Sequence, residues 1–158
     1  MKTFDLAIIE TGNGGDIQQK GNDLAIVNGV ENMIYLAMFG GNVEASTTAV
    51  ITQSQSFDFW GNTVFASNSP SQQFNSETER TIRTIALNSS GRLALIQAVE
   101  QDLNYLKSVA DITIEVEIIG SSQTRIIVTF SEKTNQQDKL LQLVYDNAKG
   151  EVIIEKII

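Results

Sequence analysis

Residues 89–130 read SSGRLALIQAVEQDLNYLKSVADITIEVEIIGSSQTRIIVTF and predict an amphipathic helix that leads directly into two strands. In the first part, apolar residues recur at the spacing of one helical face; they are Leu95, Ile96, Val99, Leu103, Leu106 and Val109. The period then becomes two, which is typical of a strand with one buried and one solvent-exposed face. The buried face is predicted to hold Ile112, Ile114, Val116, Ile118, Ile126, Val128 and Phe130. We therefore expect a helix packed across a hairpin that turns at Gly120–Ser122.

The alternation also predicts a register for this hairpin, because a shift of one residue would turn a whole strand over. The expected pairs are Ile118 with Ile126, Val116 with Val128 and Ile114 with Phe130. In that register Glu117 and Arg125 are diagonal neighbours on the solvent-exposed face.

The composition is that of one globular domain. A chain of 158 residues buries roughly 68–70% of its unfolded surface, and 42% hydrophobic with 19% charged residues lies outside the disordered range. The net charge of −8 makes nucleic acid and anionic membranes unlikely partners. No apolar run approaches the roughly 20 residues of a membrane span. The segment Met1–Asp5 has no signal-peptide core, so we expect synthesis and folding in the cytoplasm.

The chain contains no cysteine and no histidine. Disulfides, thiol catalysis and Cys/His zinc sites are thereby excluded, as are a Ser-His-Asp triad and any acid–base role of histidine. An enzyme would have to use carboxylates, lysines or tyrosines. We expect no catalytic site, no cofactor, no metal and no small-molecule substrate.

An N-terminal hairpin is predicted from two strand-like segments, Phe4–Ile9 and Asn22–Val27. Residues 10–21 between them are rich in glycine and are interpreted as a plain loop. A phosphate-binding loop is a weaker interpretation because no Gly-Lys-Ser/Thr follows. A calcium loop is also weaker, because the EF-hand spacing and its final glutamate are absent.

Two more helices are predicted from capping-box spacing. One spans Asn28–Phe39 with Asn28 and Glu31 as its capping box. Its buried face is predicted to hold Val30, Met33, Ile34, Ala37 and Met38. The other runs from the capping box of Ser76 and Glu79 to about Leu87, and Ser89 or Ser90 then caps the central helix.

The C-terminal part is predicted to add two strands, Leu140–Tyr145 and Glu151–Ile158, after a polar loop at Ser131–Lys139. The predicted fold class is therefore α+β. It is a small single domain, residues 1–158, with an N-terminal hairpin, about three helices and a C-terminal, largely antiparallel sheet of about four strands.

Residues 42–73 are polar and lack periodicity, which in a compact domain is usual for a functional loop or a partly disordered one. Within them lies the aromatic island Phe57-Asp58-Phe59-Trp60-Gly61-Asn62, with the only tryptophan of the chain. The large surface of Trp60 belongs either in the core or at an interface. Asp58, Phe59, Trp60, Gly61 and Asn62 are accordingly interface candidates.

Four blocks of sequence resemble the baseplate wedge proteins of Mu-like contractile-tailed phages, a family related to the lysozyme-like wedge group. They are residues 21–29 (GNDLAIVNG), 36–42 (LAMFGGN), 57–62 (FDFWGN) and 74–80 (FNSETER), the last leading into Leu87–Ser90 and the central helix. The aromatic pair before Gly-Asn is the most specific feature. Trp60 matches the second tryptophan of the family's pair, whereas Phe59 occupies the place of the first.

The resemblance implies a structural role in a contractile tail, near the start of the sheath. Its partners would be other baseplate and sheath proteins, and its place in the finished particle would be the virion tail baseplate. An exposed edge strand could accept a strand of such a partner. The candidate edge is the C-terminal strand, with Val152, Ile154 and Ile157 as interface residues. The alternative is that this strand is buried on both faces in the protein's own core.

Two other functions remain as alternatives. A glycosidase would need two carboxylates roughly 5–9 Å apart. Asp58 is the best candidate for the acid, with Glu10 or Asp16 as its possible second member, whereas Glu77 and Glu79 point in different directions on a helix. A tail-assembly factor that does not stay in the particle would fit the acidic charge and the exposed edge equally well.

Overall fold

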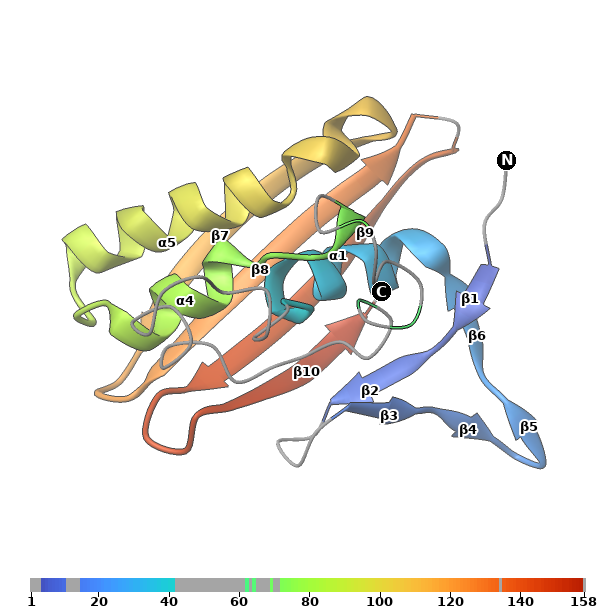
Figure 1. The fold of residues 1–158 in the computed structure, drawn as a ribbon, viewed down its shortest axis with the longest axis horizontal. Helices are drawn as coiled ribbons and strands as arrows, with labels where there is room; N and C mark the ends of the chain where they lie inside the picture. The colour runs from blue at the N-terminus through green and yellow to red at the C-terminus, as the bar shows by residue number, and fades with distance from the viewer. Residues whose placement is uncertain are drawn as a thin grey trace.

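The computed structural model describes residues 4–10, 15–41, 62, 64, 69, 72–133 and 135–157. Four long strands form one antiparallel sheet in the order β10-β9-β8-β7. They are β7 (Ala110–Ile119), β8 (Gln123–Glu132), β9 (Asn135–Asp146) and β10 (Glu151–Ile157). The predicted fold class, an α+β domain with three helices and a four-stranded C-terminal sheet, is confirmed (Figure 1).

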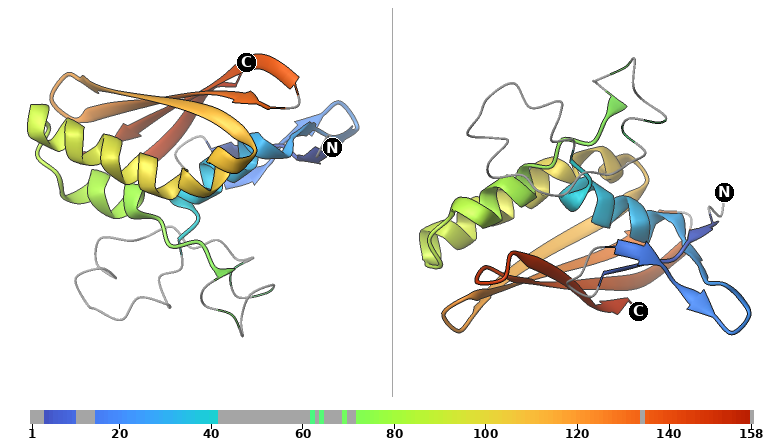
Figure 2. Two further views of the ribbon diagram at one scale, coloured as in Figure 1. Left: turned by 90° about the horizontal axis from the view of Figure 1, so that it is seen from above. Right: turned by 60° about the horizontal axis from the view of Figure 1, so that its bottom comes forward.

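Three α-helices lie on one side of this sheet (Figure 2). They are α1 (Gly29–Phe39), α4 (Glu77–Thr84) and α5 (Ser89–Asp102), and α5 continues into the 3-10 helix η2 (Asn104–Ser108). Helix α5 crosses the sheet next to β7, and α4 packs beside α5. The described elements leave the opposite face of the sheet uncovered.

The core lies between α5 and the sheet, as the hydrophobic periodicity predicts. Leu95, Val99, Leu103 and Leu106 are fully buried from the helical side, and Ile126, Val128, Phe130, Leu141 and Leu143 are buried from the strands. Val109, which was predicted to share the helical face, is instead half exposed. The chain tightens into η2 before Val109, and the smaller number of residues per turn rotates its side chain off the apolar face.

The predicted hairpin register is wrong by two residues. Observed pairs are Ile112 with Phe130, Ile114 with Val128 and Val116 with Ile126. The apolar faces are nevertheless the predicted ones, because a shift of two preserves the side to which each residue points. A short turn causes the shift: Ile119 pairs directly with Gln123, and Gly120 takes a φ of 66°. Glu117 is therefore directly opposite Arg125, and their side chains form an ion pair at 2.8 Å.

The polar segment predicted as a loop at Ser131–Lys139 belongs largely to β8 and β9. Ser131 pairs with Asp138 and Phe130 with Lys139. Main-chain hydrogen bonds can continue a ladder beyond its apolar part, because polar side chains are tolerated where they point to solvent. The periodicity therefore placed the start of the third strand too late.

Helix α1 is confirmed, but its predicted buried face is incomplete. Val30, Ile34, Ala37 and Met38 are buried as expected, whereas Met33 is exposed. Tyr35 and Phe39 are buried in addition. Their burial follows from the neighbours of α1, which packs against α4 and α5 as well as against β1 and β6.

The N-terminal hairpin is more elaborate than predicted. The strands are β1 (Phe4–Leu6), β2 (Ile8–Glu10), β3 (Gly15–Ile17), β4 (Gln19–Lys20), β5 (Asp23–Leu24) and β6 (Ile26–Asn28). The expected pairing of the first segment with the last is confirmed for β1 and β6, but β2 pairs with β3 and β4 pairs with β5. The glycine-rich connection thus supplies strands of its own rather than a plain loop. We call residues 4–10 and 15–28 the N-terminal β unit; in Figure 1 it projects beyond the end of the large sheet.

Candidate functional site

The C-terminal strand β10 is an edge strand among the described strands of the sheet, where it pairs with β9. Its side chains also contribute to the core: Val152 is fully buried and Ile154 is partly buried against the same cluster. Ile157 pairs through its backbone with Leu141. Strand β10 is therefore an edge strand with one buried face, and burial on both faces, the alternative left open by the sequence, is not observed for its described side chains.

The edge at β10 is regular only over its first part. The register with β9 shifts between Ile154 and Lys156, which marks a β-bulge at Glu155. Strand β2 also lies close to β10. A partner strand could pair with β10 over residues 151–154.

The aromatic island lies mostly outside the described residues, and this includes Asp58, Phe59, Trp60 and Gly61. Its last member, Asn62, is buried. The side-chain amide of Asn62 donates to the carbonyl of Gly40 at 2.8 Å and accepts from the backbone N–H of Phe74 at 3.0 Å. Asn62 thus links the end of α1 to the segment before α4, and in this chain its amide serves an internal role.

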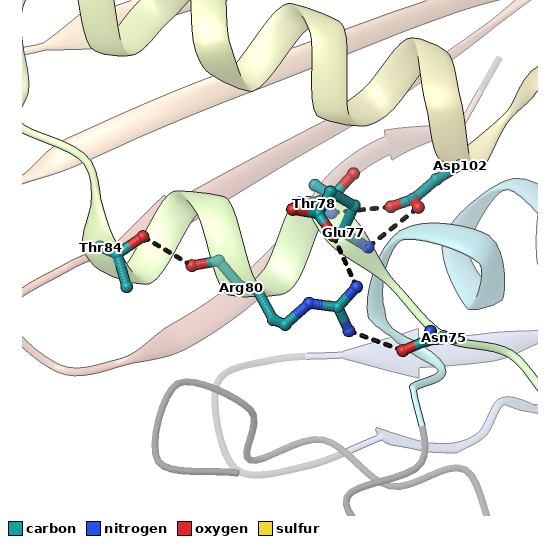
Figure 3. A network of polar contacts seen from close by, with 6 residues as sticks. All are labelled: Asn75, Glu77, Thr78, Arg80, Thr84 and Asp102. Atoms are coloured by element: carbon teal, nitrogen blue, oxygen red, sulfur yellow. Dashed lines mark hydrogen bonds and ion pairs between the residues drawn. The ribbon is translucent and has the colours of Figure 1, made fainter. Parts of the chain in front are cut away.

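A polar cluster joins the N-terminus of α4 to the end of α5 (Figure 3). The carboxylate of Asp102 accepts hydrogen bonds from the backbone N–H groups of Glu77 at 2.9 Å and Thr78 at 2.7 Å. These are two of the N–H groups that a helix leaves without intrahelical partners. Arg80 extends the cluster by donating to Asn75 at 2.7 Å and Glu77 at 2.6 Å.

This arrangement differs from the predicted capping box of Ser76 and Glu79. The Ser76 side chain makes no capping hydrogen bond. A carboxylate from another helix, 24 and 25 residues away, caps α4 instead. The N-cap of α5 is Asn88, one residue before the predicted Ser89, because the Asn88 side chain accepts a hydrogen bond from the N–H of Gly91. Local spacing could indicate where α4 begins, but it held no signal for a cap supplied from a distant segment.

Burial raises the pKa of Asp102 above its ordinary value. The Thr78 side chain, the two backbone N–H groups and Arg80 act in the opposite direction without cancelling that effect. Nearby, burial raises the pKa of Tyr105 to about 12, and the Asp102 charge adds to the shift. The Tyr105 hydroxyl donates to the carbonyl of Met33 at 3.2 Å, so the cluster extends from α4 and α5 to α1.

Glu79, which the sequence assigned to a cap, is fully buried and forms an ion pair with Arg83 one turn later at 3.4 Å. Arg83 in turn lies against the turn between β9 and β10, where a Cβ on Gly150 would be 3.6 Å from its Nη2 atom. The pair therefore attaches α4 to that turn. Its chemistry is that of a structural contact between a helix and the sheet.

The acid candidate of the glycosidase alternative and its two possible second members have no described side chains. Asp58 lies outside the described residues, and Glu10 and Asp16 are placed by their backbone only, in β2 and β3. Among the residues that the structure describes, no group of three or more carboxylates is placed to hold a metal ion. Within the same residues, no helix has the length and apolar character needed to cross a bilayer.

No known family model matches the chain, and no curated protein or solved structure is significantly similar to it.

Proposed function

We propose that this chain is a structural subunit of the baseplate wedge of a contractile phage-type tail. It acts by binding neighbouring baseplate and sheath proteins and catalyses no reaction. The resemblance of the four sequence blocks supplies the biological setting of this proposal. The geometry supplies a physical means of binding.

Described residues of three of the four blocks contact one another. Gly40 belongs to the second block, Asn62 to the third and Phe74 to the fourth, and the Asn62 amide hydrogen-bonds to both of the others. The one described residue of the third block thus connects the second block to the fourth. This convergence supports reading them as parts of a single pattern rather than as separate chance matches.

The observation that carries the proposal is the open sheet. Within the part of the chain that the structure describes, strands β7 and β10 each pair on one side, so main-chain donors and acceptors line the other edge of each strand. Strand β7 bears the exposed carboxylates Glu115 and Glu117, and charges of this kind discourage strand addition. The first four residues of β10 are the better site for a partner strand.

The proposal is tested by mass spectrometry of purified contractile-tail particles from the source organism. If the chain co-sediments with sheath and tube proteins in fixed stoichiometry, it is a component of the tail. If intact tails form while the chain stays in the unassembled fraction, the wedge role is wrong and the assembly-factor alternative replaces it.

The role of the β10 edge is tested with Ile153→Lys, which adds a charge at the edge without removing a core side chain. Thr129→Lys on the interior strand β8 is the matched control, because Thr129 and Ile153 are both partly exposed and both belong to the outward-facing series of their strands. We expect Ile153→Lys to reduce incorporation into particles and Thr129→Lys to leave it near the wild-type level. Equal incorporation of both variants would show that the β10 edge does not bind a partner during assembly.

A further inference from the structure

Exposed apolar side chains gather in the N-terminal β unit. Phe4 is 72% exposed and Ile26 is 67% exposed, while Leu24, Ile17 and Leu6 are 48%, 46% and 38% exposed. These values stand out because the side chains are large and lie within 25 residues of one another. The other exposed large apolar residues of the described chain are Met33, Val64, Leu93, Tyr105 and Val109, which come from separate elements. Single exposed apolar residues are ordinary, but a group of them marks an interaction site.

The geometry of the unit explains why these side chains share one side. Its three ribbons, β1–β6, β2–β3 and β4–β5, meet at Ala7, Gln18 and Ala25. The three residues form a closed ring of backbone hydrogen bonds: Ala7 donates to Ala25, Ala25 to Gln18 and Gln18 to Ala7, at 2.8–2.9 Å. Each strand segment therefore exchanges one partner for another at the junction while its side chains continue to alternate.

The alternation separates an apolar side from a polar one. Leu6 pairs with Ile26, and Phe4 lies two residues before Leu6 on the same side. Ile8 follows on that side, pairs with Ile17 and packs partly against the core of the domain. Leu24, two residues before Ile26, completes the set. We call Phe4, Leu6, Ile17, Leu24 and Ile26 the apolar face; it begins at the domain core and continues into solvent.

We propose that the apolar face is a docking surface for a basic region of a different protein. This proposal extends the proposed function and rests on it for the expectation that the partner is a neighbour in tail assembly. The five side chains expose roughly 500 Å² of apolar surface, which lies in the range of functional patches on monomers. With a polar rim, such a patch can form the centre of a standard interface of about 800 Å² per partner.

The charge of the chain indicates which kind of partner fits. Each copy carries a net charge of −8, so two copies that met through this face would repel each other. Asp5 and Asp23 alternate with the apolar residues, so their exposed carboxylates lie on the reverse side of the same two-stranded ribbons. A second copy is thus disfavoured, and a partner with positive charge around an apolar centre is complementary.

The proposal is tested by site-specific photo-crosslinking in cells that produce tails. p-Benzoylphenylalanine replaces Phe4 in one variant and Ile26 in another, and Leu93 in the control, because Leu93 is 55% exposed on α5. After irradiation, the crosslinked peptides are identified by mass spectrometry. We expect both apolar-face positions to crosslink to one polypeptide other than this chain, through a peptide with net positive charge, and Leu93 not to do so.

Two further variants test the apolar and the charged contributions separately. In both variants p-benzoylphenylalanine replaces Leu24 as the crosslinking probe. Phe4→Ser combined with Ile26→Ser should lower the crosslink yield at least about tenfold, since apolar contacts at the centre of an interface dominate its affinity. Asp5→Lys combined with Asp23→Lys should lower it by a smaller factor. Circular dichroism should show unchanged folding for both, because the substituted side chains are exposed. If the double serine variant misfolds, Phe4→Ser alone takes its place.

Crosslinks to a second copy, to an acidic peptide, or with the same pattern as Leu93 would overturn the inference. So would a yield that neither pair of substitutions changes. The presence of the chain in purified tails is scored separately in the same cells. A chain that is absent from tails but crosslinks as expected would refute the wedge role while keeping the docking surface, so failure of one proposal is distinguishable from failure of the other.

Discussion

One buried amide, that of Asn62, connects two segments that the sequence alone does not bring together. Replacing it with alanine would leave the Gly40 carbonyl and the Phe74 N–H without their partner in a buried setting. We expect Asn62→Ala to lower the free energy of unfolding by about 2–3 kcal/mol. Urea denaturation measures this change. Asn22→Ala, in the exposed turn between β4 and β5, is the control and should change the value by less than about 0.5 kcal/mol.

Asp102 predicts a distinctive dependence of stability on pH. Burial raises its pKa in the folded state above the ordinary value of 3.8. The folded state therefore holds the proton more tightly than the unfolded state, and the contribution of Asp102 to stability is largest at low pH and declines as the pH rises from about 3.8 through the raised pKa. We expect the difference in unfolding free energy between the wild type and Asp102→Asn to decrease over that interval.

Asp146 provides a control with the opposite sign. Hydrogen bonds from the Gln123 side chain and from the N–H groups of Ala148 and Lys149 lower the pKa of its carboxyl. Its contribution to stability is thus present above pH 3.8 and is lost as the pH falls through the lowered pKa. The difference between the wild type and Asp146→Asn should increase with pH. Parallel curves for the two variants would contradict the assignment of Asp102 as a buried cap.

Among the elements, α1 and β9 are joined by an ion pair between residues 108 positions apart. Lys139 donates to Glu31 at 2.8 Å, and the Glu31 side chain is almost fully buried. Lys139→Met leaves that carboxylate buried without its cation and should cost roughly 2 kcal/mol. Adding Glu31→Gln should recover part of the loss. A double-mutant cycle measures the coupling, and an energy near zero would show that the pair contributes nothing to holding α1 on the sheet.

Two glycines at the ends of elements separate backbone strain from steric contact. Gly120 has a φ of 66°, and a Cβ at this position would meet only open space, so Gly120→Ala should cost about 1–2 kcal/mol through strain alone. Gly91 near the start of α5 is different, because a Cβ there would collide with the Ala86 carbonyl. Gly91→Ala should therefore lower the melting temperature more than Gly120→Ala does. Gly120→Asn should be milder than Gly120→Ala, since asparagine tolerates this conformation better.

Elements with a strong period could be predicted from the sequence, whereas their partners could not. The pattern from Leu95 to Phe130 identified a helix, two strands and their buried faces, because burial itself imposes that period. The register depended on the tight turn at Gly120, which shifts the pairing by two residues without changing the pattern. The cap by Asp102 and the ring at Ala7, Gln18 and Ala25 depend on contacts between distant segments, for which local spacing holds no information.

The same limit applies to the candidate site. The prediction that the segment at Glu151–Ile157 forms an edge strand agrees with the order of the described strands. The sequence left open whether Val152 lies at an interface or in the core, because neither face of such a segment is marked by polar residues, and the structure buries this side chain in the core. The apolar face was missed for a different reason. Each of its short strands looks like an ordinary half-buried strand, and its exposure follows from the way three ribbons share one junction.

At the scale of the whole molecule, the acidic net charge and the exposed apolar face have opposite effects on association between copies of the chain. With a net charge of −8, repulsion keeps copies apart at pH 7. Near the sequence pI of about 4.4 this repulsion disappears while the apolar face stays exposed.

We expect light scattering of the purified chain to rise steeply as the pH falls from 6 towards 4.4, at a pH where circular dichroism still shows the folded state. Phe4→Ser combined with Ile26→Ser should stay clear over the same interval, because these substitutions remove apolar surface and leave the net charge unchanged. Leu93→Ser removes an isolated exposed side chain with the same absence of charge change, and it should scatter like the wild type. If the double serine variant associates as strongly as the wild type, the attraction between copies comes from another surface, and the apolar face is too weak to act as a docking site.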